Sequence, residues 1–278
     1  MVRSLIDVGV VIMIITTAAI AAAQPAKAGR TTNGIAYDVQ GEGPVVVLVT
    51  GSNLDRRMWA REAGWLASNH TVVRYDLRAH GASDTATIPF SHVDDLFTLL
   101  DEIGIHKATL IGLSAGSTIA LDAALAEPSR VDRLVLVGPA ISGFRSGAQL
   151  PFAAALVAAL QARDYARAGE VLLDSSVFAV PHESQALVRQ MVIENDRLWS
   201  VPRELMRQAE RPALDRLGEV NIPTLILIGE NDLLQREEAE MLARRVTAAR
   251  LVIIPSGGHL LNLTSPEEFR AEISQFVR

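Results

Sequence analysis

The 278-residue sequence contains no cysteine. It therefore excludes disulfide bonds, a thiolate nucleophile and metal sites built from cysteine ligands. It also has no run of lysine and arginine that could follow a phosphate backbone, and 26 basic against 32 acidic residues give a net charge of -6. We therefore expect no nucleic-acid partner. With 49% apolar residues, the chain is long enough to form one large folded core.

The N-terminus has the pattern of a secretory signal peptide. Arg3 precedes an uncharged, mostly apolar stretch over residues 8–23, and a stretch of roughly 16 residues is short for a full membrane span. Small residues suited to cleavage stand at Ala21-Ala22-Ala23, with a second choice at Ala26-Lys27-Ala28. We expect residues 1–23 to be removed on export to the periplasm or the medium. The alternative is an uncleaved membrane anchor formed by residues 8–23.

Beyond the N-terminus, short apolar runs alternate with helical patterns. The runs are rich in Val, Ile and Leu and lack polar alternation, as do strands that are buried on both faces. They cover residues 45–50, 71–75, 108–113, 134–137, 224–228 and 251–254. Residues 92–103 and 118–126 have the periodicity of crossover helices. This βαβ order predicts an α/β fold with a mostly parallel, doubly wound sheet.

The alternation stops over residues 141–217, where residues 151–173 and 183–207 favour helices and no strand is evident. We therefore predict a core of residues 30–140 and 218–278 that carries a helical insertion. Because the insertion follows a strand end, it would cover the carboxyl edge of the sheet, where doubly wound sheets bind ligands. It is predicted to form a lid. The alternative is an ordinary pair of surface helices.

The main chemical signal is the segment Gly112-Leu113-Ser114-Ala115-Gly116, which joins a predicted strand to a predicted helix. In a GxSxG turn the serine sits on a sharp, strained bend, so the residues two before and two after it must be small. The turn would lift the hydroxyl above the sheet, and the next amide would face an oxyanion formed there. Ser114 is thus the candidate nucleophile and Ala115 N–H a candidate oxyanion donor. The alternative is a helix start with a capping serine.

A serine nucleophile needs a general base, and the base needs an acid that fixes its tautomer. The expected chain order is Ser, acid, His. Only His182 and His259 follow the serine, and His182 lies in the helical insertion, whereas His259 lies in the loop after the last predicted strand. His259 is therefore the candidate base. Asp232 is the candidate acid, with Glu230 as its rival, and a helix cap is the alternative role for Asp232.

The second oxyanion donor should lie in the loop after an earlier strand. That loop is Thr50-Gly51-Ser52-Asn53, where Gly51 allows the backbone to turn the next amide inward. Ser52 N–H is the first candidate for this donor and Asn53 N–H the second. The predicted oxyanion hole therefore consists of the Ser52 and Ala115 amides, and this chemistry requires neither a metal nor an organic cofactor.

Taken together, these motifs resemble those of the α/β-hydrolase superfamily over about residues 35–277. Residues 75–83, Tyr-Asp-Leu-Arg-Ala-His-Gly-Ala-Ser, look like the family's Asp-x-Arg-Gly-x-Gly-x-Ser loop, which is usually structural. Residues 223–232 look like its acid-bearing strand, and residues 257–259 with 265–269 are similar to its His loop and final helix. The resemblance implies the α/β-hydrolase fold and a serine hydrolase.

Segments 50–59 and 74–76 look like those of the enol-lactonase and small-esterase branch. The sequence departs from the usual pattern at three positions: Thr50 replaces a common His, and Ala79 and Ser117 each replace a common Gly. Dehalogenases and epoxide hydrolases of this fold use an Asp nucleophile where this chain has Ser114, so the resemblance excludes those reactions.

The resemblance implies acyl transfer from a carboxylic ester, or a lactone, of a small and partly apolar substrate. An insertion rich in Ala, Leu and Val would supply an apolar pocket. The same triad also serves C–C bond hydrolysis, acyl transfer to an alcohol and perhydrolysis of the haloperoxidase type. A low-turnover ligand-binding protein on the same fold is the alternative from another class. No residue decides the oligomeric state, and no membrane partner is expected beyond an uncleaved anchor.

Overall fold

The computed structural model describes residues 26–145, 147 and 150–278. The predicted signal peptide, residues 1–23, lies outside this part of the chain. Among the described residues, no helix is both long and apolar enough to cross a membrane.

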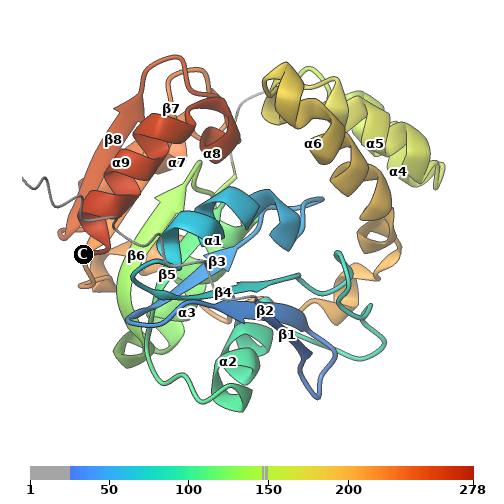
Figure 1. Ribbon diagram of the computed structural model, residues 1–278. Helices are drawn as coiled ribbons and strands as arrows, with labels where there is room; N and C mark the ends of the chain where they lie inside the picture. The colour runs from blue at the N-terminus through green and yellow to red at the C-terminus, as the bar shows by residue number, and fades with distance from the viewer. Residues whose placement is uncertain (1–25, 146, 148–149) are drawn as a thin grey trace, which may run out of the picture.

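Within these residues, eight strands form one sheet in the order β1-β2-β4-β3-β5-β6-β7-β8 (Figure 1). Strands β3 to β8 run parallel to one another, and β2 and β1 extend the sheet beyond β4 with antiparallel pairing. Their bounds are β1 Lys27–Arg30, β2 Ala36–Gln40, β3 Val45–Val49, β4 Thr71–Tyr75, β5 Ala108–Leu113, β6 Val131–Val137, β7 Thr224–Gly229 and β8 Ala249–Ile254. The predicted mostly parallel sheet is confirmed.

The sequence did not predict the two antiparallel strands. β1 and β2 are short and carry polar residues, and β1 is largely exposed at the sheet edge, so neither has the continuous apolar run of a buried strand. β1 begins at Lys27, which is before residue 30, where the core was expected to begin. The second predicted cleavage segment, residues 26–28, therefore overlaps this strand.

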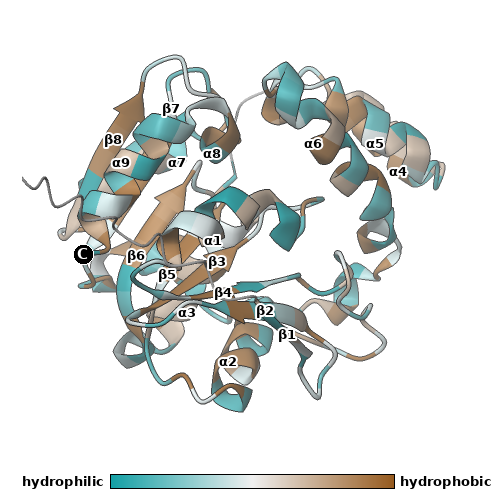
Figure 2. Ribbon diagram, in the orientation of Figure 1, coloured by the Kyte–Doolittle hydropathy of each residue, from teal (hydrophilic) through white to brown (hydrophobic). Residues whose placement is uncertain are grey.

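The strands bury side chains on both faces, because successive residues point to opposite sides. Val47 and Val49 of β3 belong to the same buried cluster as residues of α2, α3 and α7, whereas Val46 and Leu48 belong to a second cluster with residues of α1 and α9. Figure 2 shows the resulting hydrophobic central strands between helices of mixed polarity. The helix bounds are α1 Ala60–Leu66, α2 His92–Glu102, α3 Ala115–Ala126, α4 Ala153–Gln161, α5 Tyr165–Leu173, α6 His182–Glu194, α7 Arg236–Arg245, α8 Leu261–Thr264 and α9 Pro266–Phe276.

The segment between β6 and β7 is helical where it is described, and in Figure 1 its helices α4, α5 and α6 are grouped apart from those that cover the sheet. The first predicted helix, residues 151–173, is two helices that are separated at Arg163, whose φ is 56°. The second helix-forming region, residues 183–207, is α-helical only as far as Glu194, where α6 ends, and Pro202 falls where a continued helix would need an N–H donor. Short 3₁₀ turns at Asp196–Ser200 and Arg203–Leu205 follow it.

Candidate active site

The Ser114 turn has the strained geometry that its sequence predicts. Ser114 has φ 54° and ψ -118°, and α3 begins at the next residue. A Cβ atom at Gly112 would lie 2.2 Å from the Gly116 carbonyl oxygen, and one at Gly116 would lie 2.3 Å from the Val49 carbonyl oxygen. Only glycine fits both positions. The Ser114 side chain makes no capping hydrogen bond to α3, so a capping role does not account for it.

The structure brings Asp232 and His259 together. The Nδ1 atom of His259 lies 2.8 Å from Asp232 Oδ2, and the two residues are only 4% and 3% exposed. The other carboxylate oxygen, Oδ1, accepts a hydrogen bond at 3.4 Å from the backbone N–H of Gln235, the residue that precedes α7. The rival acid Glu230 is exposed and instead accepts a hydrogen bond from the Ser256 amide at 3.0 Å. The geometry therefore favours Asp232 over Glu230 as the partner of the histidine.

Ser114 and His259 line the same cavity of about 120 Å³. Ser52, in the loop after β3, lines it too. The remaining walls are mainly apolar and include Leu172 and Phe178, both from the segment between β6 and β7. The predicted nucleophile, base and first oxyanion donor thus meet at one small cavity. His182, the histidine set aside from the sequence, is instead the first residue of α6.

Gly138, which the sequence analysis did not identify, packs against the Asp232–His259 pair. It directly follows β6 and has φ 47°, in the left-handed region. A Cβ atom there would lie 2.9 Å from His259 Nδ1 and 3.0 Å from Asp232 Oδ2. A glycine immediately after a buried strand was the available signal, since it often marks a close approach of backbone to another group.

The two candidates for the second oxyanion donor differ in what their amides contact. The Asn53 N–H donates to His80 Nε2 at 3.3 Å, because the other ring nitrogen, Nδ1, donates to the Arg78 carbonyl at 2.9 Å. Burial lowers the pKa of His80 to about 4, which keeps the ring neutral and Nε2 an acceptor. Within the described chain, the Ser52 and Ala115 amides donate to no acceptor. The geometry therefore favours Ser52 over Asn53.

Ser117, noted in the sequence only as a departure from glycine, has a specific role in the turn. Its hydroxyl donates to the Ser114 carbonyl at 2.6 Å and accepts from the Ala140 amide at 3.0 Å. The residue is fully buried. It therefore joins the Ser114 turn to the chain that leaves β6.

The motif expected to be structural, residues 75–83, joins two loops through Asp76. Asp76 accepts hydrogen bonds from the Arg56 amide at 2.9 Å and the Ala82 amide at 2.8 Å, and it forms an ion pair with the Arg56 guanidinium. Burial raises the pKa of Asp76 although these donors oppose the shift. Ala79, in place of the usual glycine, has φ 63° and so adopts a conformation that costs an L-residue free energy.

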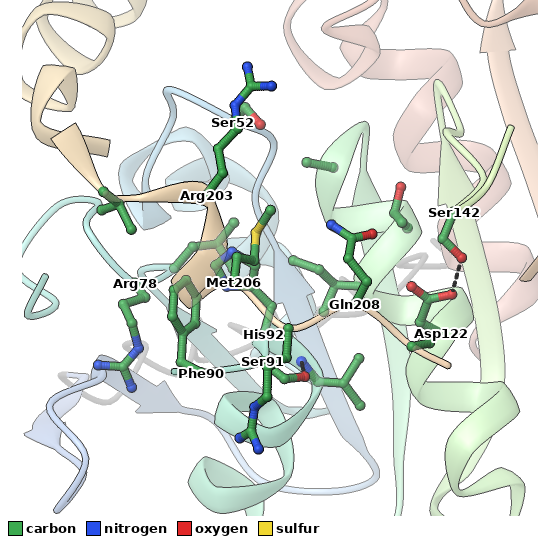
Figure 3. Close-up of a pocket in the computed structure, with 18 of the residues that line it drawn as sticks. Ser52, Arg78, Phe90, Ser91, His92, Asp122, Ser142, Arg203, Met206 and Gln208 are labelled. Atoms are coloured by element: carbon green, nitrogen blue, oxygen red, sulfur yellow. Dashed lines mark hydrogen bonds between the residues drawn. The ribbon is translucent and has the colours of Figure 1, made fainter. Parts of the chain in front are cut away.

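The two oxyanion candidates Ser52 and Ala115 also line a much larger cavity of about 1120 Å³. Figure 3 shows Ser52 among the residues around it. The start of α2, the outer face of α3 and residues 198–211 form its walls. These walls are both apolar and polar, with Trp199 and Met206 beside Arg203 and Gln208. The predicted apolar wall from the insertion is therefore present only in part.

Asp122 projects from α3 into the wall of this larger cavity. Its carboxylate accepts a hydrogen bond from the Ser142 hydroxyl at 2.7 Å, as Figure 3 shows. Burial raises the pKa of Asp122, and the hydrogen bond from Ser142 opposes that shift. In the described part of the chain, no cluster of His, Asp and Glu side chains could hold a metal ion.

Comparisons with known proteins agree with the fold and with a hydrolase of the α/β type. The chain matches the model of the alpha/beta hydrolase family over residues 46–272. It is similar to a putative carbamate hydrolase, RutD, from Agrobacterium fabrum, at 25% identity over 85% of this chain and 94% of that protein. It is also 25% identical to 3-oxoadipate enol-lactonase 1 from Acinetobacter baylyi, over 84% of this chain and 89% of that protein.

Solved structures of esterases have the same fold as this chain. An esterase from Thermogutta terrifontis superimposes with a TM-score of 0.74 at 26% identity, covering 91% of this chain and 98% of the esterase. The esterase RhEst1 from Rhodococcus shares the fold with a TM-score of 0.76 at 22% identity, again over 91% and 98% of the two chains. Fold and site together define a hydrolase of the α/β type. The chain belongs to the alpha/beta hydrolase family.

Proposed function

We propose that the protein is a serine hydrolase that cleaves a carboxylic ester or a lactone through an acyl-enzyme. Ser114 is the nucleophile, His259 the general base and Asp232 the acid that orients it. The observation that carries the proposal is the buried Asp232–His259 pair at 2.8 Å, whose histidine lines the same cavity as the serine on its strained turn. The names of similar proteins, which include an enol-lactonase and an esterase, support the same class of chemistry.

The proposed reaction has two halves. Ser114 Oγ attacks the substrate carbonyl while its proton passes to His259 Nε2, and Asp232 stabilises the imidazolium through Nδ1–H. The Ser52 and Ala115 amides donate to the oxyanion. When the tetrahedral intermediate collapses, the proton passes from Nε2 to the leaving oxygen. A water molecule then repeats the sequence on the acyl-enzyme and releases the acid.

The two cavities suggest the shape of the substrate. The 120 Å³ cavity beside Ser114 and His259 is mainly apolar and has room for roughly four water-sized groups, at about 30 Å³ each. The 1120 Å³ cavity, which Ser52 and Ala115 help to line, has both polar and apolar walls. We therefore propose a substrate with one short apolar arm and one longer arm that carries polar groups.

Labelling with a fluorophosphonate probe tests the proposed nucleophile and base. In the wild-type protein we expect one adduct, located by mass spectrometry at Ser114. The substitutions Ser114→Ala and His259→Ala should each abolish it, while both variants keep the wild-type circular-dichroism spectrum. A folded wild-type protein that neither reacts with the probe nor hydrolyses any ester or lactone would instead favour the ligand-binding alternative.

We also propose that the protein is exported and that cleavage follows Ala23. Cleavage there would leave β1 complete, because that strand begins at Lys27, whereas cleavage after Ala28 would remove half of it. N-terminal sequencing of protein recovered from the periplasm or the medium should read Gln24 first. Protein found only in the membrane fraction with its N-terminus retained would support the anchor, and protein found only in the cytoplasm would refute export.

A further inference from the structure

The residue directly after helix α6 connects the helical insertion to the loop that carries the proposed oxyanion donor. Asn195 is completely buried. Its side-chain Nδ2 donates to the Asn53 carbonyl at 3.3 Å and to Asp55 Oδ2 at 3.1 Å, and its Oδ1 accepts from the Gly81 amide at 2.6 Å. One side-chain amide therefore fastens two core loops to the insertion, the Ser52 loop (residues 50–57) and the Asp76 loop (residues 76–83).

Charged neighbours strengthen the same junction. Arg57 of the Ser52 loop lies 2.6 Å from Asp55 Oδ2 and 2.6 Å from Glu194 Oε2, at the end of α6. Burial raises the pKa of Asp55, but hydrogen bonds from Arg57 and Asn195 outweigh it and hold the pKa below its ordinary value. Asp55 therefore remains an ionised acceptor. Arg197 adds hydrogen bonds to the carbonyl oxygens of the Asp76 loop, at Ala79 and Ser83.

These contacts fix the residue that follows the proposed oxyanion donor. Asn53 has φ 62°, a conformation that costs a non-glycine residue free energy and persists only where its surroundings impose it. Its N–H is held by His80 and its carbonyl by Asn195. With the peptide groups on both sides of Asn53 held, the preceding residue, Ser52, is kept at the edge of both cavities.

We propose that Asn195 is a positioning residue for the reaction: it holds the Ser52 loop so that the Ser52 N–H points at the oxyanion. The helical insertion then contributes to the rate and does not only cover the site. This inference rests on the proposed serine-hydrolase function. It does not require Asn195 to touch the substrate.

The expected loss of kcat in an Asn195 variant can be bounded by what one oxyanion donor contributes to the rate. Removing one such donor costs about 100- to 1000-fold in kcat. Loosening the loop should cost less, so we expect Asn195→Ala to lower kcat by about 10- to 100-fold and to change KM by less than about threefold. The affinity for a trifluoromethyl ketone, which forms a charged hemiketal with the serine, should fall by a similar factor, since that adduct needs the same amides.

The experiment compares three variants of the full protein. Asn195→Ala removes all three hydrogen bonds, whereas Asn195→Asp keeps the shape and the acceptor for Gly81 but loses both donors. Arg189→Ala is the matched control, because it lies on α6 and forms an exposed ion pair with Glu170 on α5. Each kcat is divided by the concentration of active sites, titrated with the fluorophosphonate probe, and the melting temperature is measured in parallel.

We expect both Asn195 variants to lose kcat per active site and ketone affinity, with KM unchanged and Arg189→Ala like the wild type. Kcat per active site within about twofold of the wild type, with only a lower melting temperature, would overturn the inference. If either variant does not fold, Asn195→Ser, which keeps a small hydrogen-bonding group, replaces it under the same criteria. A wild-type protein without turnover or labelling would refute the proposed function itself, so the two failures are distinguishable.

Discussion

His80 Nε2 accepts a hydrogen bond from the backbone N–H of Asn53 at 3.3 Å. This contact distinguishes the two candidates for the second oxyanion donor, the Ser52 N–H and the Asn53 N–H. The amide that it engages cannot also serve an oxyanion. The remaining candidate donor is the Ser52 N–H. Under the proposal above, its position depends on His80 as well as on the helical insertion.

Replacing His80 should therefore reduce the rate. We expect His80→Leu to lower kcat by about 10- to 100-fold, because it removes the acceptor for the Asn53 N–H. His80→Gln should retain most of the activity, since its side-chain carbonyl can accept the same bond. His106→Gln, a change at an exposed histidine, is the control. Steady-state kinetics on one ester checks this, and a fully active His80→Leu would contradict it.

Gly138→Ala should impair the Asp232–His259 pair without unfolding the protein. The added methyl group would lie 2.9 Å from His259 Nδ1 at a residue with φ 47°, so the ring or the strand end has to move. A small misplacement of a catalytic base costs about 100-fold in kcat. The control is Gly64→Ala in α1, where a Cβ meets nothing within 4 Å. This control should raise the free energy of unfolding by roughly 0.5 to 1 kcal/mol.

If Gly138→Ala had the same kcat and pH–rate profile as the wild type, the close packing of Gly138 against the Asp232–His259 pair would not be needed for catalysis. Thermal unfolding of both variants separates a local displacement of the histidine from general destabilisation. The expected result is a large loss of kcat with a modest loss of stability.

The buried parallel strands were predictable from the sequence because their apolar character is continuous, as in β5, whose bounds agree with the prediction. Ser114 was predictable because its tight turn requires glycine at both Gly112 and Gly116, so five consecutive residues carry the whole signal. Asn195 and His80 were not, because their partners lie up to 142 residues away and their polar types have no local pattern. The strands β1 and β2 were missed for a related reason: they form because β2 pairs with β4 and β1 with β2, not because of hydrophobic periodicity.

Phe178 should limit the length of the short substrate arm. It lines the 120 Å³ cavity together with Leu172 and Val177. We expect wild-type kcat/KM to fall once one arm exceeds roughly four carbon atoms, and Phe178→Leu to raise kcat/KM for longer arms by about 10-fold relative to short ones. An ester panel in which acyl and alcohol lengths vary independently measures this. Phe276→Leu on α9, which lines neither cavity, is the control. Equal length dependence in all three proteins would contradict the assignment.

Glu62 should make stability depend on pH near neutrality. It lies on α1 and is only 2% exposed, and the Asn262 side chain donates to it at 3.4 Å. Burial raises the pKa of Glu62 to about 7, which hydrogen bonding and nearby arginines only partly oppose. Because its pKa is higher in the folded than in the unfolded state, the folded protein binds the extra proton. The resulting stability is complete below about pH 4.5 and is lost as pH rises through about 7.

Glu62→Gln should therefore remove a pH-dependent loss of stability. Glutamine mimics the protonated carboxyl, so the variant should be close to the wild type near pH 5 and more stable near pH 8, by about 2 to 3 kcal/mol. Urea unfolding at the two pH values measures the difference, with the exposed Glu42→Gln as control. The two Gln variants would behave alike if Glu62 stayed ionised in the folded protein, and the assigned pKa direction would then be wrong.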